Sequence, residues 1–321
     1  SKDPAADAFL IGIAVAGAGY DVNKFSSDAA KFAAETGKPL VVAAPQPNIA
    51  AQFKANGLVV YPTEGEAVRA LSLYLTHTEL MAGAKLRNPT IKPAPRLIQE
   101  SKLLDEAASL ALLAKFGVPV VKHALCQSEE EAAAVFTNMK STAVVVKGCT
   151  EDASHKSELG LVRLGVSDVA ALRQAFKDMH AAAKSASIQL TGIIVAEQVK
   201  GRRELMIGAR VDPVFGPVVL VGDGGKYVEA MPDLQVLMAP FSIEDVEKAL
   251  HRLRIAPLLS GVRGESPLDV KAFCQSAVAV GQMMAEEKLG ISQLDINPVM
   301  VGSLGQGCVS LDAVIYRKEN T

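Results

Sequence analysis

The sequence predicts an α/β protein with several cores, and three observations support this fold class. Its 321 residues exceed the span of about 100 to 200 residues that one domain usually covers. Between residues 8 and 80, apolar runs alternate with helical patterns. Toward the C-terminus, short apolar runs follow one another with fewer helical patterns between them. We therefore expect a parallel sheet, followed by a part that is richer in antiparallel strands.

The first segment has a βαβαβα pattern. Its alternating strand and helix patterns are FLIGIAVA, SSDAAKFAAETG, KPLVVAA, NIAAQFKANG, LVVYP and GEAVRALSLYL. Continuous apolar strands separated by amphipathic helices indicate a parallel sheet that is covered on both faces. Three strands are fewer than the five or six or so of an average sheet, and the chain starts with Ser1. We therefore expect residues 1–84 to be part of a larger domain.

A linker is expected at residues 85–97, where prolines are frequent and periodicity is lost. The next part, 98–190, is expected to form one α+β subdomain. Apolar residues at helical spacing from Leu103 to Leu113 predict a helix, which ends at Gly117. The patterns that follow alternate between strand and helix: VPVVKHAL, EEEAAAVFTNM, AVVVK, LGLVRLGV and VAALRQAFKDMHAAAKS.

Residues 191–321 are expected to form a second α+β subdomain. After the strand GIIVAEQV, three runs predict neighbouring antiparallel strands: RELMIGARV, GPVVLVGDGG and KYVEAM. Helical patterns follow near 243–253 and 266–288. The chain closes with the strands LDINPVMV and CVSLDAVIYR.

Composition excludes several classes of partner. The 33 Lys and Arg against 35 Asp and Glu give a formal net charge of −2, without a basic block for nucleic acid. No apolar run approaches the ~20 residues of a membrane span, and the N-terminus lacks a secretory signal, so we expect a cytoplasmic protein. The 4 cysteines are scattered without CxxC spacing. Any metal should therefore be a hard cation bound by oxygen, such as magnesium.

Lys147 ends the strand pattern AVVVK, where a strand can hold an ammonium group rigidly at the edge of a cleft. That position suits the binding of nucleotide phosphates. A surface lysine at a strand end explains the residue equally well.

His155 begins HKSELGLV in a predicted polar loop, where an imidazole could accept a phosphoryl group as a covalent carrier. A surface histidine without function is the alternative. The other four histidines, which lie within helix or strand patterns, are interpreted as structural.

Three glycines, Gly222, Gly224 and Gly225, directly follow an apolar strand in PVVLVGDGGKYVE. They allow the backbone to approach a ligand closely and to adopt positive φ. A tight turn would also explain them. The pattern is neither GxGxxG nor a P-loop, so those phosphate-binding mechanisms do not apply.

The candidate metal ligands are Asp295 and Asn297 in LDINP and Asp312 in SLDA. Two carboxylates and an amide carbonyl supply hard oxygen ligands, and magnesium completes its coordination with water and phosphate oxygens. Turn residues are the alternative. The isoleucines and leucines beside these polar residues favour carboxylates that project from a buried sheet.

Taken together, the patterns resemble the ATP-grasp module of the ADP-forming acyl-CoA synthetases, in the superfamily that also contains succinyl-CoA synthetase. Between about residues 97 and 317, eight motifs follow the family in order: EAASLALLAKFGVPV, AVVVKGCT, HKSELGLV, GIIVAEQV, RELMIGARVDPVFGPVVLVGDGG, LLSGVRG, LDINPV and LDAVI. GKPLVV and YPTEGEAVRAL are similar to the last half of the flavodoxin-like domain that precedes the module. The resemblance implies an ATP-grasp fold of two α+β subdomains after a partial flavodoxin-like sheet.

The resemblance also implies roles for single residues. Lys147 would contact nucleotide phosphates, Glu197 would lie in the hinge beside the adenine site, and Glu204 would face the nucleotide cleft. Asp295, Asn297 and Asp312 would hold Mg²⁺. His155 would be a second phosphohistidine of the relay.

In the family, a carboxylic acid, CoA and ATP are interconverted with acyl-CoA, ADP and phosphate through an acyl phosphate and a phosphohistidine. The resemblance implies that CoA binds through upstream domains, on the same parent chain or on a separate subunit, which also carry the first phosphohistidine. This chain would supply the site for ATP or ADP and Mg²⁺, as part of a homo- or hetero-oligomer.

Two alternatives stay open. The chain could be a nucleotide- or CoA-sensing scaffold of a synthetase-like regulatory protein, such as an acetyltransferase fusion. Leu161 and Leu237, which stand where the family has a glycine and an arginine, favour this alternative, because leucine cannot replace the forked contact of arginine with phosphate. The chain could also be a structural subunit that completes a partner's sheet.

Overall fold

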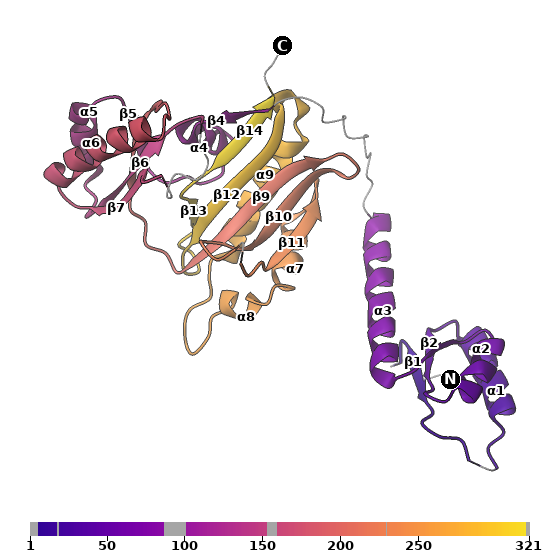
Figure 1. The fold of residues 1–321 in the computed structure, drawn as a ribbon. Coiled ribbons are helices and arrows are strands. Elements are labelled where there is room, and N and C mark those ends of the chain that lie inside the picture. Colours follow the sequence, from indigo (N-terminus) through magenta and orange to yellow (C-terminus); the bar gives the residue numbers. More distant parts are fainter. Residues whose placement is uncertain (1–5, 18, 87–100, 153–158, 229, 319–321) are drawn as a thin grey trace. The chain divides into compact units, whose positions relative to one another are not determined.

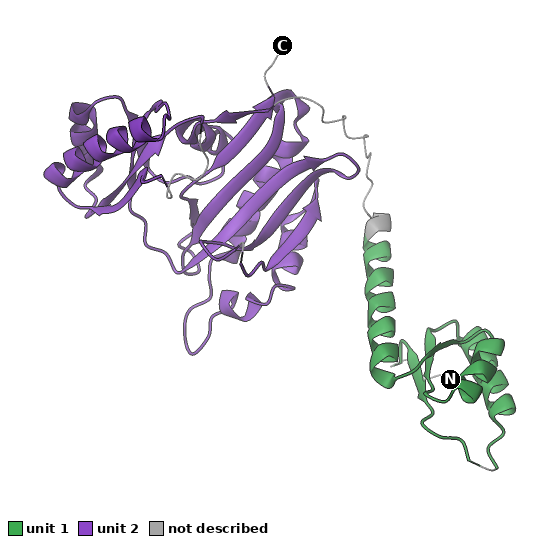
Figure 2. Cartoon of the chain, in the orientation of Figure 1, with its two compact units in different colours: residues 1–91 green, residues 92–321 purple. Residues whose placement is uncertain are grey.

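The computed structural model describes residues 6–17, 19–86, 101–152, 159–228 and 230–318. The chain divides into two compact units, residues 1–91 and 92–321 (Figure 2). Among the residues that the structure describes, no helix combines the length and the apolar character that crossing a membrane requires.

The first unit is a parallel sheet of three strands in the order β1-β2-β3 (Figure 1). Its elements alternate as predicted: β1 (Phe9–Gly12), α1 (Val22–Thr36), β2 (Leu40–Ala43), α2 (Pro47–Ala55), β3 (Val59–Tyr61) and α3 (Glu64–Leu86). Val42 of β2 packs with Ile49 and Phe53 of α2, whereas Val41 packs with Ala67 of α3. Both faces of the central strand are therefore covered, which confirms the prediction of a parallel sheet buried on both sides.

The second unit contains two sheets. The first part of the chain in this unit forms β4 (Ser101–Leu104), α4 (Glu106–Lys115), β5 (His123–Cys126), α5 (Glu129–Met139), β6 (Val144–Cys149), β7 (Val162–Val166), α6 (Val169–Ser185) and β8 (Gly192–Glu197). The remainder forms β9 (Arg203–Asp212), β10 (Gly216–Asp223), β11 (Leu234–Met238), α7 (Ile243–Leu250), α8 (Ala256–Leu259), α9 (Val270–Ala285), η1 (Glu287–Leu289), β12 (Ile291–Val301), β13 (Cys308–Ser310) and β14 (Val314–Lys318).

The smaller sheet has four antiparallel strands in the order β5-β8-β6-β7. Helices α5 and α6 cover one of its faces (Figure 1). The larger sheet has seven strands in the order β11-β10-β9-β12-β14-β4, with β13 beside β12. Helices α7 and α9 cover one face of this sheet. The opposite face is called the site face below.

Alternation along β9 and β12 decides which side chains reach the site face. Leu205 and Ile207 of β9, and Leu294 and Ile296 of β12, belong to the core under α7 and α9. The intervening residues therefore point to the other side of the sheet. Glu204 and Gly208 of β9 and Asp295 and Asn297 of β12 lie on the site face by this rule. A register shift between Ile296 and Val299 marks a bulge next to Asn297.

A small apolar cluster joins the two sheets. Val121, Cys149, Ile194 and Ala196, from or next to the smaller sheet, form this cluster, and Leu311 packs against it. The backbone N–H of Val121 also donates to the carbonyl of Ser310, at 2.9 Å. The loop between β13 and β14 is therefore packed against the smaller sheet.

Two sequence predictions about elements are wrong. Leu103 and Leu104 lie in β4 and not in a helix, because Asp105 caps α4 by accepting a hydrogen bond from the Ala108 N–H at 2.8 Å. KYVEAM does not supply the strand that follows β10, since its described residues form turns and β11 pairs with β10 instead. The predicted strands RELMIGARV and GPVVLVGDGG do pair with each other, as β9 and β10.

Candidate functional site

Lys147 lies between the two sheets of the second unit. Its neighbours in β6, Val144 and Val146, belong to the core beneath α5 and α6, so the lysine projects from the other face, toward the loop before β14. Its Nζ donates hydrogen bonds to Oε1 of Glu106 at 2.7 Å, to the Leu311 carbonyl at 2.8 Å and to Oδ2 of Asp312 at 3.2 Å. Only 8% of the residue is exposed, which excludes the alternative of an ordinary surface lysine.

Glu106 is part of this cluster, although the sequence did not single it out. It is the first residue of α4 and is 1% exposed. A carboxylate is favoured in the first turn of a helix, and the lysine ammonium balances its buried charge. One sequence signal could have revealed it: in a helix that starts at Glu106, this residue shares a face with Leu110 and Leu113.

The charge state of Lys147 follows from two opposed effects. Burial is the largest influence on its pKa and lowers it, but the carboxylates of Asp312 and Glu106 together outweigh burial, so the pKa is raised. The side chain is therefore an ammonium at neutral pH, between two carboxylates.

Asp295 lies on the site face next to Gly208 of β9. A Cβ atom at Gly208 would be 3.7 Å from Oδ1 of Asp295, so the glycine leaves room beside the carboxylate. Burial, and then the negative charge of Asp312, raises the pKa of Asp295 to about 6. A partly buried carboxylate whose ionisation is disfavoured by a second carboxylate is a donor that a divalent cation would stabilise.

Asn297 connects the sheet to the glycine turn. Its Oδ1 accepts a hydrogen bond from the Gly225 N–H at 2.8 Å. Glu204 lies at the same turn, since a Cβ at Gly225 would come within 2.1 Å of its Oε2. The structure therefore brings Glu204, Gly225 and Asn297 together. The sequence analysis had assigned them separately, to the nucleotide cleft, to a glycine turn and to the metal site.

Three glycines, one near the end of β10 and two directly after it, allow close packing around the turn. A Cβ would lie 2.2 Å from the Asp233 carbonyl oxygen at Gly222 and 2.5 Å from the Leu205 backbone at Gly224, and Gly225 has a φ of +79°. The alternative of a tight turn thus accounts for these residues. The same turn also presents the Gly225 backbone at the site face.

The predicted metal ligands Asp295, Asn297 and Asp312 supply two carboxylates and one amide oxygen. Within the described ranges, no group of three or more His, Cys, Asp or Glu side chains forms a metal site. Two carboxylates and an amide oxygen are the type of donor set that suits a hard cation such as magnesium, which takes a few protein oxygens and completes its coordination with water and phosphate.

The other two predicted site residues are Glu197 and His155. Glu197 is the last residue of β8, is exposed, and is followed by the crossing from the smaller sheet to β9 of the larger one. Its backbone N–H donates to the Lys122 carbonyl at 2.9 Å. His155 lies outside the described residues, in the segment between β6, which carries Lys147, and β7.

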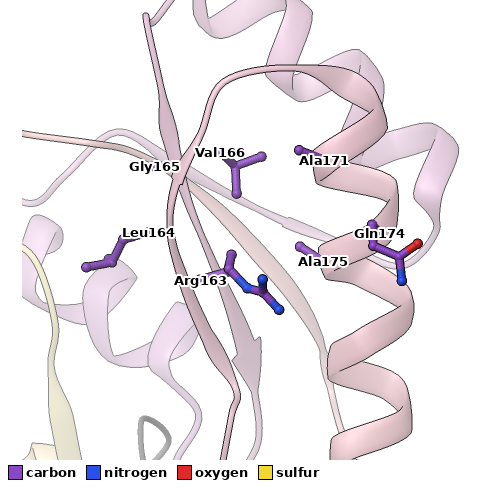
Figure 3. Close-up of a pocket in the computed structure, with 7 residues that line it drawn as sticks. All are labelled: Arg163, Leu164, Gly165, Val166, Ala171, Gln174 and Ala175. Carbon is purple, nitrogen blue, oxygen red and sulfur yellow. The ribbon is translucent and has the colours of Figure 1, made fainter.

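A separate pocket lies between β7 and α6 (Figure 3). The side chains that line it are mostly short or apolar. They are Arg163, Leu164, Gly165, Val166, Ala171, Gln174 and Ala175. None of the predicted site residues contributes to this pocket.

Comparison with known proteins gives a family and a set of relatives. Residues 95–316 match a sequence family described as an ATP-grasp domain. The chain is 31% identical over 277 residues to 4-hydroxybutyrate–CoA ligase [ADP-forming] of Nitrosopumilus maritimus, which covers 82% of this chain and 39% of that protein. It is 32% identical to the beta subunit of acetate–CoA ligase [ADP-forming] I of Pyrococcus furiosus, over 62% of this chain and 86% of that subunit.

Solved structures show the same relationship. Acetyl-coenzyme A synthetase 1 of Ca. Korarchaeum cryptofilum, in complex with coenzyme A and Ca-AMPCP, superposes with a TM-score of 0.63 at 29% identity, over 75% of this chain and 99% of that chain. Another structure of that protein holds coenzyme A and Mg-AMPPCP, with a TM-score of 0.58, 29% identity, and coverage of 68% of this chain and 93% of that chain. The present chain spans 39% of the length of the Nitrosopumilus relative.

Proposed function

We propose, from the premise that this chain belongs to the ATP-grasp family, that it binds a magnesium nucleotide and transfers its phosphoryl group within an ADP-forming acyl-CoA synthetase. The family membership and the similar solved structures confirm the predicted ATP-grasp fold, and the predicted parallel sheet before it is present with three strands. The relatives are named ADP-forming ligases.

The observation that carries the proposal is the charge arrangement around Lys147. One buried ammonium lies 3.2 Å from Asp312, and burial together with the negative charge of Asp312 raises the pKa of Asp295. An ammonium next to a pair of partly buried carboxylates can bind phosphate and a divalent cation side by side. Positioning and charge neutralisation of this kind are what phosphoryl transfer requires of a protein.

Each site residue has a proposed task. Lys147 would donate to nucleotide phosphate oxygens, and Asp295, Asn297 and Asp312 would hold Mg²⁺. When bound, Mg²⁺ would neutralise charge on the phosphate oxygens. Glu204, with Gly222 of β10 and with Gly224 and Gly225 in the turn that follows, would border the nucleotide. Glu197, at the crossing between the sheets, would lie beside the adenine.

His155 is proposed as the phosphoryl acceptor. One solved relative is described with a phosphohistidine segment pointing towards its nucleotide-binding site. We infer that CoA and the carboxylic acid bind to a partner subunit or to further domains, since one relative is itself named a beta subunit. The reaction of the assembly would be acid, CoA and ATP to acyl-CoA, ADP and phosphate, in a homo- or hetero-oligomer.

The strand pairing suggests how the module divides. We propose two ATP-grasp subdomains, first placed at 98–190 and 191–321. Because β8 pairs with β5 and β6, the crossing after Glu197 is a better boundary than residue 190. All four cysteines are buried and form no disulfide, which supports a reducing compartment, and we propose the cytoplasm.

The scaffold alternative depended on Leu161 and Leu237. Leu161 is fully buried in the core beneath α5 and α6, and its carbonyl accepts a hydrogen bond from Gly148 at 2.8 Å. Leu237 packs against the core beneath α7 and α9, on the side away from Asp295. Packing therefore accounts for both leucines, and the enzyme remains our proposal.

Calorimetric titration of the chain with ATP, ADP and GTP, with and without Mg²⁺, tests this function. We expect a magnesium nucleotide to bind wild type, and binding to weaken at least tenfold or so in Lys147→Gln, as for a lost charged hydrogen bond. A folded wild-type chain that binds none of the three nucleotides would contradict the proposal.

A further inference from the structure

Arg203 and Asp223 form an ion pair where the ladder between β9 and β10 ends, and neither residue belongs to the site described above. Nε of Arg203 donates to Oδ1 of Asp223 at 3.1 Å, and Nη2 donates to Oδ1 at 2.6 Å and to Oδ2 at 2.7 Å. The two side chains are 31% and 26% exposed, so the pair is partly shielded from solvent. Two nitrogens that bind two oxygens fix the orientation of both groups, which a single contact does not.

We propose that Arg203 and Asp223 are a positioning pair, which holds the glycine turn against β9 and so places Glu204 and Asn297 for a magnesium nucleotide. The inference rests on the proposed nucleotide site. It goes beyond that site because the pair has no contact with the nucleotide or the metal in the roles assigned above.

The pair lies on the face of the larger sheet that is opposite the site face. Asp223 stands opposite Leu205 in the register of β9 and β10, and Arg203 stands opposite Val301 in the register of β9 and β12. Leu205 and Val301 both belong to the core beneath α7 and α9. Residues that stand opposite each other share a face, so Arg203 and Asp223 also point to that side. The pair can therefore act on the site only through the backbone.

The backbone that leaves β10 after Asp223 is connected directly to two of the proposed site residues. The Gly224 N–H donates to the Glu204 carbonyl at 3.1 Å. The Gly225 N–H donates to Oδ1 of Asn297 at 2.8 Å. Both hydrogen bonds come within two residues of Asp223, so the position of this residue determines where the two donors lie.

The turn needs such a contact because it consists of glycines at this point. Glycine has no side chain to pack and has more backbone freedom than any other residue. Gly225 has a φ of +79°, and Gly224 lies so close to β9 that a Cβ would be 2.5 Å from the Leu205 backbone. A close approach of two flexible residues has to be maintained by their neighbours. The ion pair supplies that restraint at Asp223, directly before the two glycines.

Arg203→Lys separates the charge of this residue from its shape. Lysine keeps the positive charge, but its ammonium cannot bind a carboxylate through two nitrogens in one plane. The Asp223 carboxylate then gains freedom, and the hydrogen bond from Gly225 to Asn297 should form less often. Asn297 is a proposed metal ligand, so we expect the loss to fall mainly on magnesium-dependent nucleotide binding.

The experiment is calorimetric titration of the full chain with ADP, in Mg²⁺ and in EDTA. Arg203→Lys should weaken ADP binding in Mg²⁺ by about threefold or more, and should weaken it less in EDTA. The matched control is Arg163→Lys, which changes another Arg–Asp pair, with Asp178 of α6 at 3.1 Å, and should keep both wild-type constants. A pair that only stabilises the fold would lower the denaturation midpoint in Arg203→Lys and leave both dissociation constants of the folded chain unchanged.

Unchanged constants in folded Arg203→Lys would therefore overturn the proposal, and so would losses of affinity that are equal in Mg²⁺ and in EDTA. If that variant does not fold, Asp223→Asn carries the same prediction. Where both variants fold, the double variant should bind ADP no more weakly than the weaker single variant, because both substitutions remove one contact. Effects that multiply would overturn the pair. A wild-type chain that binds ADP under neither condition would instead refute the nucleotide site itself, and this inference with it.

Discussion

The amide oxygen of Asn297 accepts a hydrogen bond from the backbone N–H of Gly225 at 2.8 Å. This contact ties β12, which carries Asp295, to the glycine turn after β10. The turn and the proposed metal ligands are therefore directly connected, and a substitution in one should alter the structure of the other.

Asn297→Ala should weaken both the fold and the site. The Gly225 N–H loses its acceptor, which should lower the free energy of unfolding by about 1 to 3 kcal/mol. Asn297→Asp keeps an acceptor oxygen and should lose less stability. Urea denaturation compares the two variants, and equal stabilities for the alanine variant and wild type would contradict the role of the contact.

Gly225→Ala should destabilise the turn more than the same change at another left-handed glycine. A Cβ at Gly225, with a φ of +79°, would meet Glu204, whereas at Gly216, with a φ of +74°, it would meet nothing within 4 Å. Gly216→Ala should cost only the backbone strain of about 1 to 2 kcal/mol. Thermal denaturation of both variants measures the extra loss of stability that the contact with Glu204 causes in Gly225→Ala. Equal losses of stability in the two variants would contradict the role of this contact.

Lys147→Met should strongly destabilise the chain, because the buried carboxylate of Glu106 loses its 2.7 Å contact with the Lys147 ammonium. Breaking a buried pair in this way costs about 3 to 5 kcal/mol. The double variant Lys147→Met, Glu106→Gln should recover part of this loss. As a control, Lys102→Met removes a partly exposed partner of Glu151 and should change stability by less than about 1 kcal/mol. Denaturant unfolding measures the free energy of unfolding of each variant. If Lys147→Met and Lys102→Met lose the same free energy within error, this account is contradicted.

The pKa of Asp295 predicts a specific pH dependence. Folding raises this pKa from 3.8 to about 6, so the folded state binds the proton more tightly than the unfolded chain does. The stabilisation from Asp295 is therefore fully present below its unfolded pKa and is lost as the pH rises through about 6. A metal needs the ionised carboxylate, so magnesium-dependent ADP binding should weaken as the pH falls below about 6.

Calorimetry between pH 5 and 8 or so would measure that dependence. Asp295→Asn removes the titrating carboxylate, so magnesium-dependent ADP binding should vary less with pH in this variant. The variant should also bind magnesium less tightly than wild type. A profile with the wild-type shape in the variant would assign the titration to another group.

His155→Ala should abolish acid-labile phosphorylation of the chain by labelled ATP while leaving nucleotide affinity unchanged. The reason is that an imidazole nitrogen, and not a phosphate contact, is lost. Labelling is followed by gel autoradiography with and without acid treatment. His180→Ala, which changes a histidine packed beside Phe176 in α6, is the control and should be labelled like wild type.

The fold could be predicted largely because the periodicity of apolar residues reports burial. The first unit matches its βαβαβα pattern, and β9 and β10 pair as expected. Where short apolar runs border turns, the prediction fails. Leu103 and Leu104 fit a helical stripe as well as a strand, and only the cap at Asp105 separates the two.

Candidate site residues can be listed from the sequence, but the contacts between them cannot be predicted from it. Lys147 and Asp312 are 165 positions apart, and no local pattern reports that their charges meet. Glu106 was missed because its burial depends on where α4 begins. The hydrogen bond from Gly225 to Asn297 depends on the pairing of β9 with both β10 and β12, which is a property of the sheet and not of either segment.

The most direct test of the nucleotide site is a crystal structure of the chain with ADP and Mn²⁺, whose anomalous scattering locates the metal. We predict an anomalous peak at Asp295, Asn297 and Asp312, with phosphate oxygens within hydrogen-bonding distance of Nζ of Lys147. Well-ordered ADP with its metal at another position, such as the pocket between β7 and α6, would contradict the account.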